Sequence, residues 1–132
     1  LTPEQFRDWV APYDIQVLAA APSLVRIAHL HGEDADPELI ADYPVEVLSW
    51  SDTASAPTIP EAASRYGWVP MVGIDELTSL YWTPSEAVAH VIQARRAAGD
   101  RLIVAPNCTL HSDINPLTLV GLRRGVDVAL TY

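Results

Sequence analysis

Apolar and polar residues alternate in blocks along the chain, and the blocks predict strands that alternate with helices. Four short apolar runs predict strands near residues 24–30, 45–50, 68–74 and 101–105, the first of them buried. Apolar residues at helical spacing, with proline or glycine at most block ends, predict the intervening helices. These helices are expected from Thr2 through Tyr13, through Val17 up to Pro22, briefly from Asp36, from Glu61 to Tyr66, from Thr83 to Ala98 and from Asn115 past Leu122.

The clearest helix start in the chain lies at residues 83–86. Thr83 is placed to cap the helix, Pro84 stands at its first position, and Glu86 occupies the capping-box place. Gly99 follows the last apolar residue of the block and predicts the helix end. A helix over residues 84–98 is therefore expected between the third and fourth strands.

Strands that alternate with helices at this spacing indicate parallel pairing through right-handed crossovers. Polar residues follow each predicted strand, and such positions share one edge of a parallel sheet, where barrel enzymes place their chemistry. An open doubly wound sheet is the alternative, but the first strand-to-helix turn lacks the glycine-rich phosphate loop typical of that fold. We therefore predict one α/β domain over residues 1–132, a half-barrel of four parallel strands with helices on its outer face.

The candidate chemistry lies where apolar strand-like runs end. His29 and His31 stand two apart, so they point to the same side of the first strand, and Cys108 follows the last strand. Two imidazoles and a thiolate form a competent zinc ligand set. The alternative is structural, because histidines near a strand end often form only a hydrogen-bonded turn and a lone cysteine often packs as a small hydrophobe. His111 is a spare ligand candidate close to Cys108.

Composition narrows the class of partner. The formal charge of −9, from 17 acidic and 8 basic residues, opposes binding to nucleic acid or to an anionic membrane surface. The sequence shows no leader and no apolar run long enough to span a bilayer, so we expect a small-molecule substrate and no membrane partner. One cysteine forms no internal disulfide, and a cytoplasmic location is expected.

Several segments, in this order and spacing, resemble the later half of the uroporphyrinogen decarboxylase superfamily, which includes the corrinoid-dependent and cobalamin-independent methyltransferases. The resemblance covers nearly the whole chain and implies a (β/α)8 TIM barrel of which this chain holds about strands five to eight. The segments that carry it are Ile27-Ala28-His29-Leu30-His31-Gly32-Glu33-Asp34, residues 39–50, Val72-Gly73-Ile74-Asp75 and Thr83-Pro84-Ser85-Glu86.

The two branches of that superfamily use different residues. In the methyltransferase branch, the resemblance implies zinc held by a His-x-Cys pair at one strand end and a Cys at the end of the last strand. His29 and Cys108 match that pattern, and His31 stands where a cysteine is usual. In the decarboxylase branch the tetrapyrrole is held chiefly by an arginine-rich segment and an aspartate of the first barrel half, which this sequence does not contain. A histidine near the end of the last strand is usual there, and Cys108 takes about that place.

The visible residues therefore favour zinc-dependent transfer of a methyl group to a thiol, with a corrinoid as candidate methyl donor. One alternative is a uroporphyrinogen decarboxylase, a lyase of porphyrin and heme biosynthesis. A further alternative is a non-catalytic half-barrel that associates with a partner. The chain alone is expected to be inactive and to need an N-terminal barrel half or self-association, because catalytic residues in a barrel come from several strands.

Two further residues at strand ends have alternative roles. Asp75 matches a motif of the superfamily and is a candidate catalytic residue, although it is equally placed to cap the following turn. Trp50 is placed either to wall the site or to pack at the barrel mouth, and packing is favoured.

Overall fold

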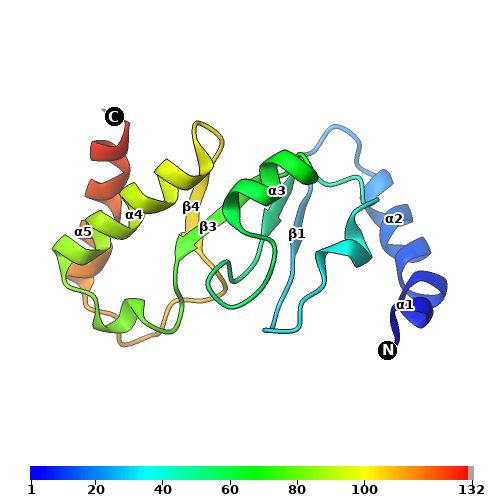
Figure 1. The fold of residues 1–132 in the computed structure, drawn as a ribbon, viewed down its shortest axis with the longest axis horizontal. Helices are drawn as coiled ribbons and strands as arrows, with labels where there is room; N and C mark the ends of the chain where they lie inside the picture. The colour runs from blue at the N-terminus through cyan, green and yellow to red at the C-terminus, as the bar shows by residue number, and fades with distance from the viewer. Residues whose placement is uncertain (131–132) are drawn as a thin grey trace.

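Four parallel strands form one sheet in which the spatial order of the strands follows their order in the chain (Figure 1). The computed structural model describes residues 1–130. All three strand pairs are parallel, and this sequential order with helices outside the sheet is that of half an eight-stranded barrel, as the sequence predicts. The strands are β1 (Ile27–His29), β2 (Val47–Ser49), β3 (Val69–Ile74) and β4 (Ile103–Pro106).

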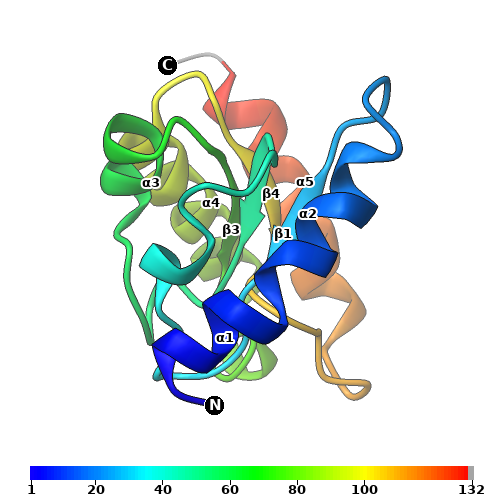
Figure 2. The ribbon, with the colours of Figure 1, turned by 90° about the vertical axis from the view of Figure 1, so that its right-hand side faces the viewer.

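The helices lie on the outer face of the sheet and at its two ends. Figure 2 shows α3 and α4 on one side of the strands, while α1 and α2 lie beside β1. Within residues 1–130, no helix combines the length and apolar character needed to cross a membrane. The helices are α1 (Pro3–Trp9), α2 (Ala11–Ala19), α3 (Ile59–Arg65), α4 (Pro84–Ala98) and α5 (Pro116–Ala129), with short 3-10 turns η1 (Pro37–Ile40) and η2 (Ser79–Tyr81).

The core lies between the sheet and these helices in two clusters. The larger one packs β2 and β3 against α3, and its centre is formed by Leu48, Trp50 and Val72, each of which is fully buried. The smaller one joins the end of β3 to α4 and α5 through Ile74, Val91 and other apolar side chains. The predicted packing role of Trp50 is confirmed, since its indole N–H donates to the Pro57 carbonyl at 2.8 Å inside the larger cluster.

The prediction that the first strand is buried is wrong. β1 is an edge strand that pairs only with β2 in the described structure, and Ile27, on the same side of the strand as His29, is 51% exposed. Leu24 and Val25, which belong to the same apolar run, lie before the strand and are also exposed. The run is apolar as a barrel strand requires, but the described residues supply no neighbour on its free side.

Two helix boundaries also differ from the predicted ones. The first predicted helix divides at Val10, because Pro12 lacks a backbone N–H and its ring disfavours helical continuation from the preceding turn. The helix expected from Glu61 begins earlier, at Ile59, because Thr58 and Glu61 form a capping box around a proline at the second helical position. The boundaries of α4 are as predicted, with Thr83 as cap and Gly99 at its end.

Two glycines of α5 allow it to cross α4 at short distance. A Cβ atom at Gly121 would lie 2.5 Å from the Pro84 carbonyl oxygen, and one at Gly125 would lie 2.8 Å from the Val91 Cβ. Both separations are shorter than any van der Waals contact, so the crossing requires residues without side chains. The start of α4 is thereby held against the middle of α5.

We expect Gly121→Ala to lower the free energy of unfolding, although alanine is the better helix former. The gain in helix propensity is about 1 kcal/mol, whereas overpacking against fixed backbone costs about 1–3 kcal/mol or more. Urea denaturation measures the difference, with Val120→Ala on the exposed side of α5 as the control. An equally or more stable Gly121→Ala protein would contradict the close crossing.

Candidate metal centre

His29 is the last residue of β1, and its ring is held by the neighbouring strand. The register pairs His29 with Ser49 of β2, and the two side chains are joined by a 3.1 Å hydrogen bond between Nδ1 and the hydroxyl. This bond leaves Nε2 as the free nitrogen of the His29 ring, as in metal sites where a second group orients a histidine ligand. Ser49 is buried, so its position is set by the packing of β2.

His31 follows two residues later on the same side of the chain. The chain turns immediately after it at Gly32, whose φ of 98° lies in the left-handed region that glycine adopts without strain. The rings of His29 and His31 are 6.1 Å apart between centroids. Both side chains are exposed, which leaves His29 Nε2 and the His31 ring accessible to a metal ion.

Cys108 is placed by the buried residue that precedes it. The Asn107 backbone N–H donates to the Ile74 carbonyl at 2.9 Å, and its side-chain oxygen accepts from the Gly73 N–H at 3.1 Å. These two bonds continue the pairing of β3 with β4 beyond the end of β4. The thiol of Cys108 is therefore carried on a fixed backbone.

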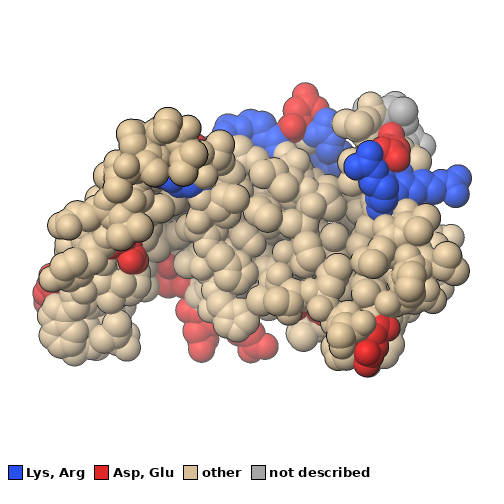
Figure 3. Space-filling view, turned by 180° about the vertical axis from the view of Figure 1, so that it is seen from behind, with Lys and Arg blue, Asp and Glu red and all other residues tan. Residues whose placement is uncertain are grey.

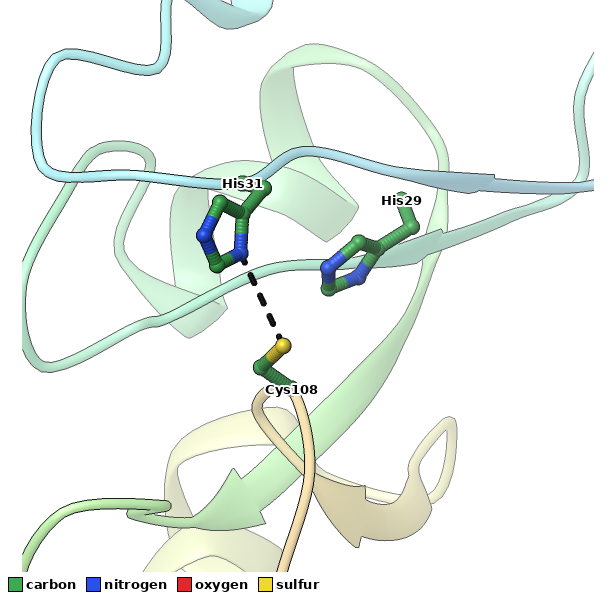
Figure 4. A group of neighbouring side chains, drawn as sticks. All are labelled: His29, His31 and Cys108. Atoms are coloured by element: carbon green, nitrogen blue, oxygen red, sulfur yellow. Dashed lines mark hydrogen bonds between the residues drawn. The ribbon is translucent and has the colours of Figure 1, made fainter.

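The three side chains meet although they come from opposite edges of the sheet. Figure 4 shows His29 and His31 directed toward Cys108, and the Cys108 sulfur lies 3.6 Å from His31 Nδ1. One ligand atom from each residue falls within 4.8 Å of the others. Strands three apart in a flat sheet are separated by about 14 Å, from roughly 4.8 Å per strand, so curvature of the sheet brings them together.

The donor set fits zinc. Ligand atoms in a tetrahedral site stand roughly 3.3–3.8 Å apart, given bonds of about 2.0–2.3 Å. The present separations of up to 4.8 Å therefore have to shorten by about 1 Å for the three atoms to bind one ion. Soft sulfur combined with imidazole nitrogen favours zinc over magnesium or calcium. Metal binding by His29, His31 and Cys108 stays a prediction.

A small cavity of about 140 Å³ borders the cluster. His31 and Cys108 form part of its wall, and Leu30 and Leu77 add apolar surface. The remaining wall includes the carboxylates of Glu33 and Glu76 and the hydroxyl of Ser51, which donates to Glu76 at 3.1 Å. A molecule in this cavity would lie directly beside two of the three candidate ligands.

Asp75, the predicted catalytic residue, lies elsewhere. Its Oδ1 accepts from the backbone N–H groups of Leu77 at 2.8 Å and Thr78 at 3.1 Å, so the carboxylate caps the turn after β3. It lines a larger cavity of about 280 Å³ beside α4. A catalytic role for Asp75 stays a prediction. His111 is exposed, and it is not a member of the cluster.

Sequence reasoning gave no role to Asp52. This residue lies behind the site, near the buried side chain of Asn107. Burial raises the pKa of this carboxyl group, and the nearby carboxylates of Asp75 and Glu76 add to the effect. The Asn107 side chain, which lies near the carboxyl group but outside hydrogen-bond geometry, and the backbone oppose the shift. One Asp52 oxygen is buried without a hydrogen-bond partner, and so is the Asn107 amide nitrogen. No spacing in the sequence distinguishes Asp52 from the other acids of these loops.

No protein-family model matches the sequence, and no curated protein matches it either. Among solved structures, a methyltransferase from Methanosarcina mazei superposes on this chain with a TM-score of 0.76 and 20% sequence identity. The match covers 97% of this chain and 38% of the methyltransferase. The likeness is one of fold. It supports a methyltransferase-type fold, while membership in the uroporphyrinogen decarboxylase superfamily stays a prediction.

We expect Asp52→Asn to raise the free energy of unfolding at pH 7. The pKa of Asp52 is higher in the folded than in the unfolded protein, so its favourable contribution is complete below the unfolded pKa near 3.9 and is lost as pH rises through the folded pKa. The stability gain of the variant should therefore grow from about pH 4 to pH 7. Urea denaturation at both pH values measures it, with the exposed Asp42→Asn as control. A variant less stable than wild type at pH 7 would refute the assignment.

Proposed function

We propose that this chain supplies the zinc-binding part of a methyltransferase active site that moves a methyl group to a thiol. The observation that carries the proposal is the approach of one ligand atom each from His29, His31 and Cys108 to within 4.8 Å of one another, beside a small cavity. The methyltransferase-type fold supports it. We further propose that the fold belongs to the uroporphyrinogen decarboxylase superfamily and corresponds to about strands five to eight.

The residues present have separate tasks in this proposal. Zinc held by the two imidazoles and the thiolate would act as a Lewis acid that lowers the pKa of a substrate thiol. Ser49 orients the His29 ring, and Asn107 fixes the backbone that carries Cys108. The substrate sulfur then attacks the methyl carbon, the bond from that carbon to its donor breaks, and the thiol proton leaves to solvent. A methylated corrinoid is the proposed donor.

The decarboxylase alternative is less well supported. Holding the carboxylates of a tetrapyrrole requires a cation, and acidic groups wall the cavity beside the cluster. Among the described residues that line that cavity, none is an arginine. The geometry therefore favours methyl transfer over decarboxylation.

We expect the purified chain to bind about one zinc ion, and Cys108→Ser to weaken that binding on the order of 100-fold, because the thiolate is the strongest ligand of the set. His31→Ala should have a similar effect. Competition with a chromogenic chelator measures the affinity. His111→Ala is the matched control, since this exposed histidine lies outside the cluster. Unchanged zinc affinity in both ligand variants would disprove the zinc site.

We also propose that a second barrel half, from a partner chain or a second copy, completes the active site. The match spans only 38% of the methyltransferase, and barrel enzymes draw catalytic residues from several strands. The chain alone is therefore expected to bind zinc without turning over substrate. Exposed Ile27 and Ile103 lie on the terminal strands of the sheet and mark the surfaces where a second half would join.

We expect the isolated chain to self-associate, because both sheet edges and these apolar side chains are uncovered. The double substitution Ile27→Lys and Ile103→Lys should shift it toward the monomer in light scattering at tens of micromolar, roughly the range of ordinary interface affinities. Tyr81→Lys, at an even more exposed position on η2 and away from the terminal strands, is the control. A wild-type monomer under these conditions would contradict the expectation.

A further inference from the structure

On one face of the molecule, the charged side chains are unevenly distributed between its two ends. In the view of Figure 3, the blue arginine side chains lie toward the upper end, where acidic side chains also occur, whereas the charged side chains visible at the lower end are all acidic. Arg26 precedes β1 and Arg101 precedes β4, at the end opposite the cluster. The chain contains no lysine, and its arginines are Arg7, Arg26, Arg65, Arg95, Arg96, Arg101, Arg123 and Arg124.

Most of these arginines are engaged away from the candidate site. Arg26 pairs with Glu46, and Arg65 pairs with Glu38 at 2.7 Å. Arg123 pairs with Asp127 at 3.4 Å, one turn along α5. None of the ion pairs within residues 1–130 includes an acidic residue that lines the cavity beside the cluster.

The carboxylates of that cavity are therefore not neutralised by neighbouring arginines. Glu33 follows Gly32 in the loop after β1, and Glu76 follows the end of β3, so they approach the cavity from different parts of the sheet. Glu76 accepts the hydroxyl hydrogen of Ser51 at 3.1 Å, which fixes its carboxylate at the wall. Two negative charges on one cavity wall attract a cation and repel an anion.

Resting on the proposed function, we infer that the acceptor is a small thiol with a positively charged end, selected by Glu33 and Glu76. The sulfur of such a molecule would lie toward His31 and Cys108, and its cationic end toward the two carboxylates. A cavity of about 140 Å³ suits a ligand of only a few heavy atoms. The apolar side chains of Leu30 and Leu77 provide contact for the short carbon chain between the two ends.

Three thiols that differ only in the group on a two-carbon chain test the inference. Thiocholine carries a quaternary ammonium, 2-mercaptoethanesulfonate a sulfonate of similar size, and 2-mercaptoethanol a neutral hydroxyl. The quaternary ammonium does not itself coordinate metal, so its effect is one of charge. Binding to the cobalt-substituted chain is followed by the increase in sulfur-to-cobalt absorption above that of the Cys108 thiolate, which requires no methyl donor and no turnover.

We expect thiocholine to bind at least about 10-fold more tightly than 2-mercaptoethanesulfonate at low salt, with 2-mercaptoethanol between them. Added salt should reduce the difference, because charges at a solvent-accessible wall are screened. Glu76→Gln should lower the preference severalfold. Glu33→Gln, in an exposed loop, provides the same test if the first variant folds poorly, and Glu4→Gln on α1 is the control that should leave the preference unchanged.

The possible outcomes separate this inference from the function on which it rests. Equal affinity for the cationic and anionic thiols, or tighter binding of the sulfonate, would overturn the charge selection and leave thiol binding at the metal intact. Absence of any increase in sulfur-to-cobalt absorption with all three thiols would overturn the proposed function, and the acceptor assignment with it. A preference that persists in both glutamine variants would show that Glu33 and Glu76 are not its source.

Discussion

Curvature of the parallel sheet is the constraint on which the candidate site depends. His29 and Cys108 follow strands at opposite edges, and only a sheet bent as in a barrel brings their side chains within 4.8 Å. Helix α4 packs directly against the outer face of this sheet, and a Cβ atom at Gly73 of β3 would stand 2.8 Å from the Ala94 Cβ. A change that flattened the sheet would separate the ligands without altering any of them.

Buried polar side chains beneath the cluster hold the ends of the strands in fixed positions relative to one another. Ser49, Ser51 and Asn107 are all buried, and each forms a hydrogen bond to a group on a neighbouring strand or strand end. An apolar layer would have been more stable by itself, since Asp52 and Asn107 each keep a buried atom without a partner. Such unfavourable polar burial concentrates at functional sites, where position matters more than stability.

How much of this structure could be predicted from the sequence depended on how local each signal was. The start of α4 at Thr83, Pro84 and Glu86 was correctly predicted because a capping box lies within four residues. The earlier start of α3 was missed because the helix was expected only from Glu61, although the same capping pattern begins at Thr58. Helix signals of this kind need no information about the rest of the fold.

Burial and catalytic geometry depend on residues far apart in the chain, and there the sequence was less informative. The apolar run before His29 predicted a buried strand, but apolarity alone does not say whether a neighbour covers it, and β1 proved to be an edge. Asp75 and Glu76 are adjacent in sequence, yet one caps a turn and faces the larger cavity while the other faces the cluster. The turn after β3 decides which carboxylate reaches the site.

The openness of the site follows from the same architecture. His29 and His31 are exposed because they face the side of the sheet where the other half of a barrel would stand. In this exposed state water screens the charges of Glu33 and Glu76, and their effect on the proposed thiol acceptor would be at its weakest. A second barrel half would exclude that water, and the same carboxylates would then act through a lower effective dielectric. Completion of the barrel would therefore strengthen the proposed electrostatic selection as well as add residues, so any discrimination measured on the isolated chain would be a lower bound on that of the closed site.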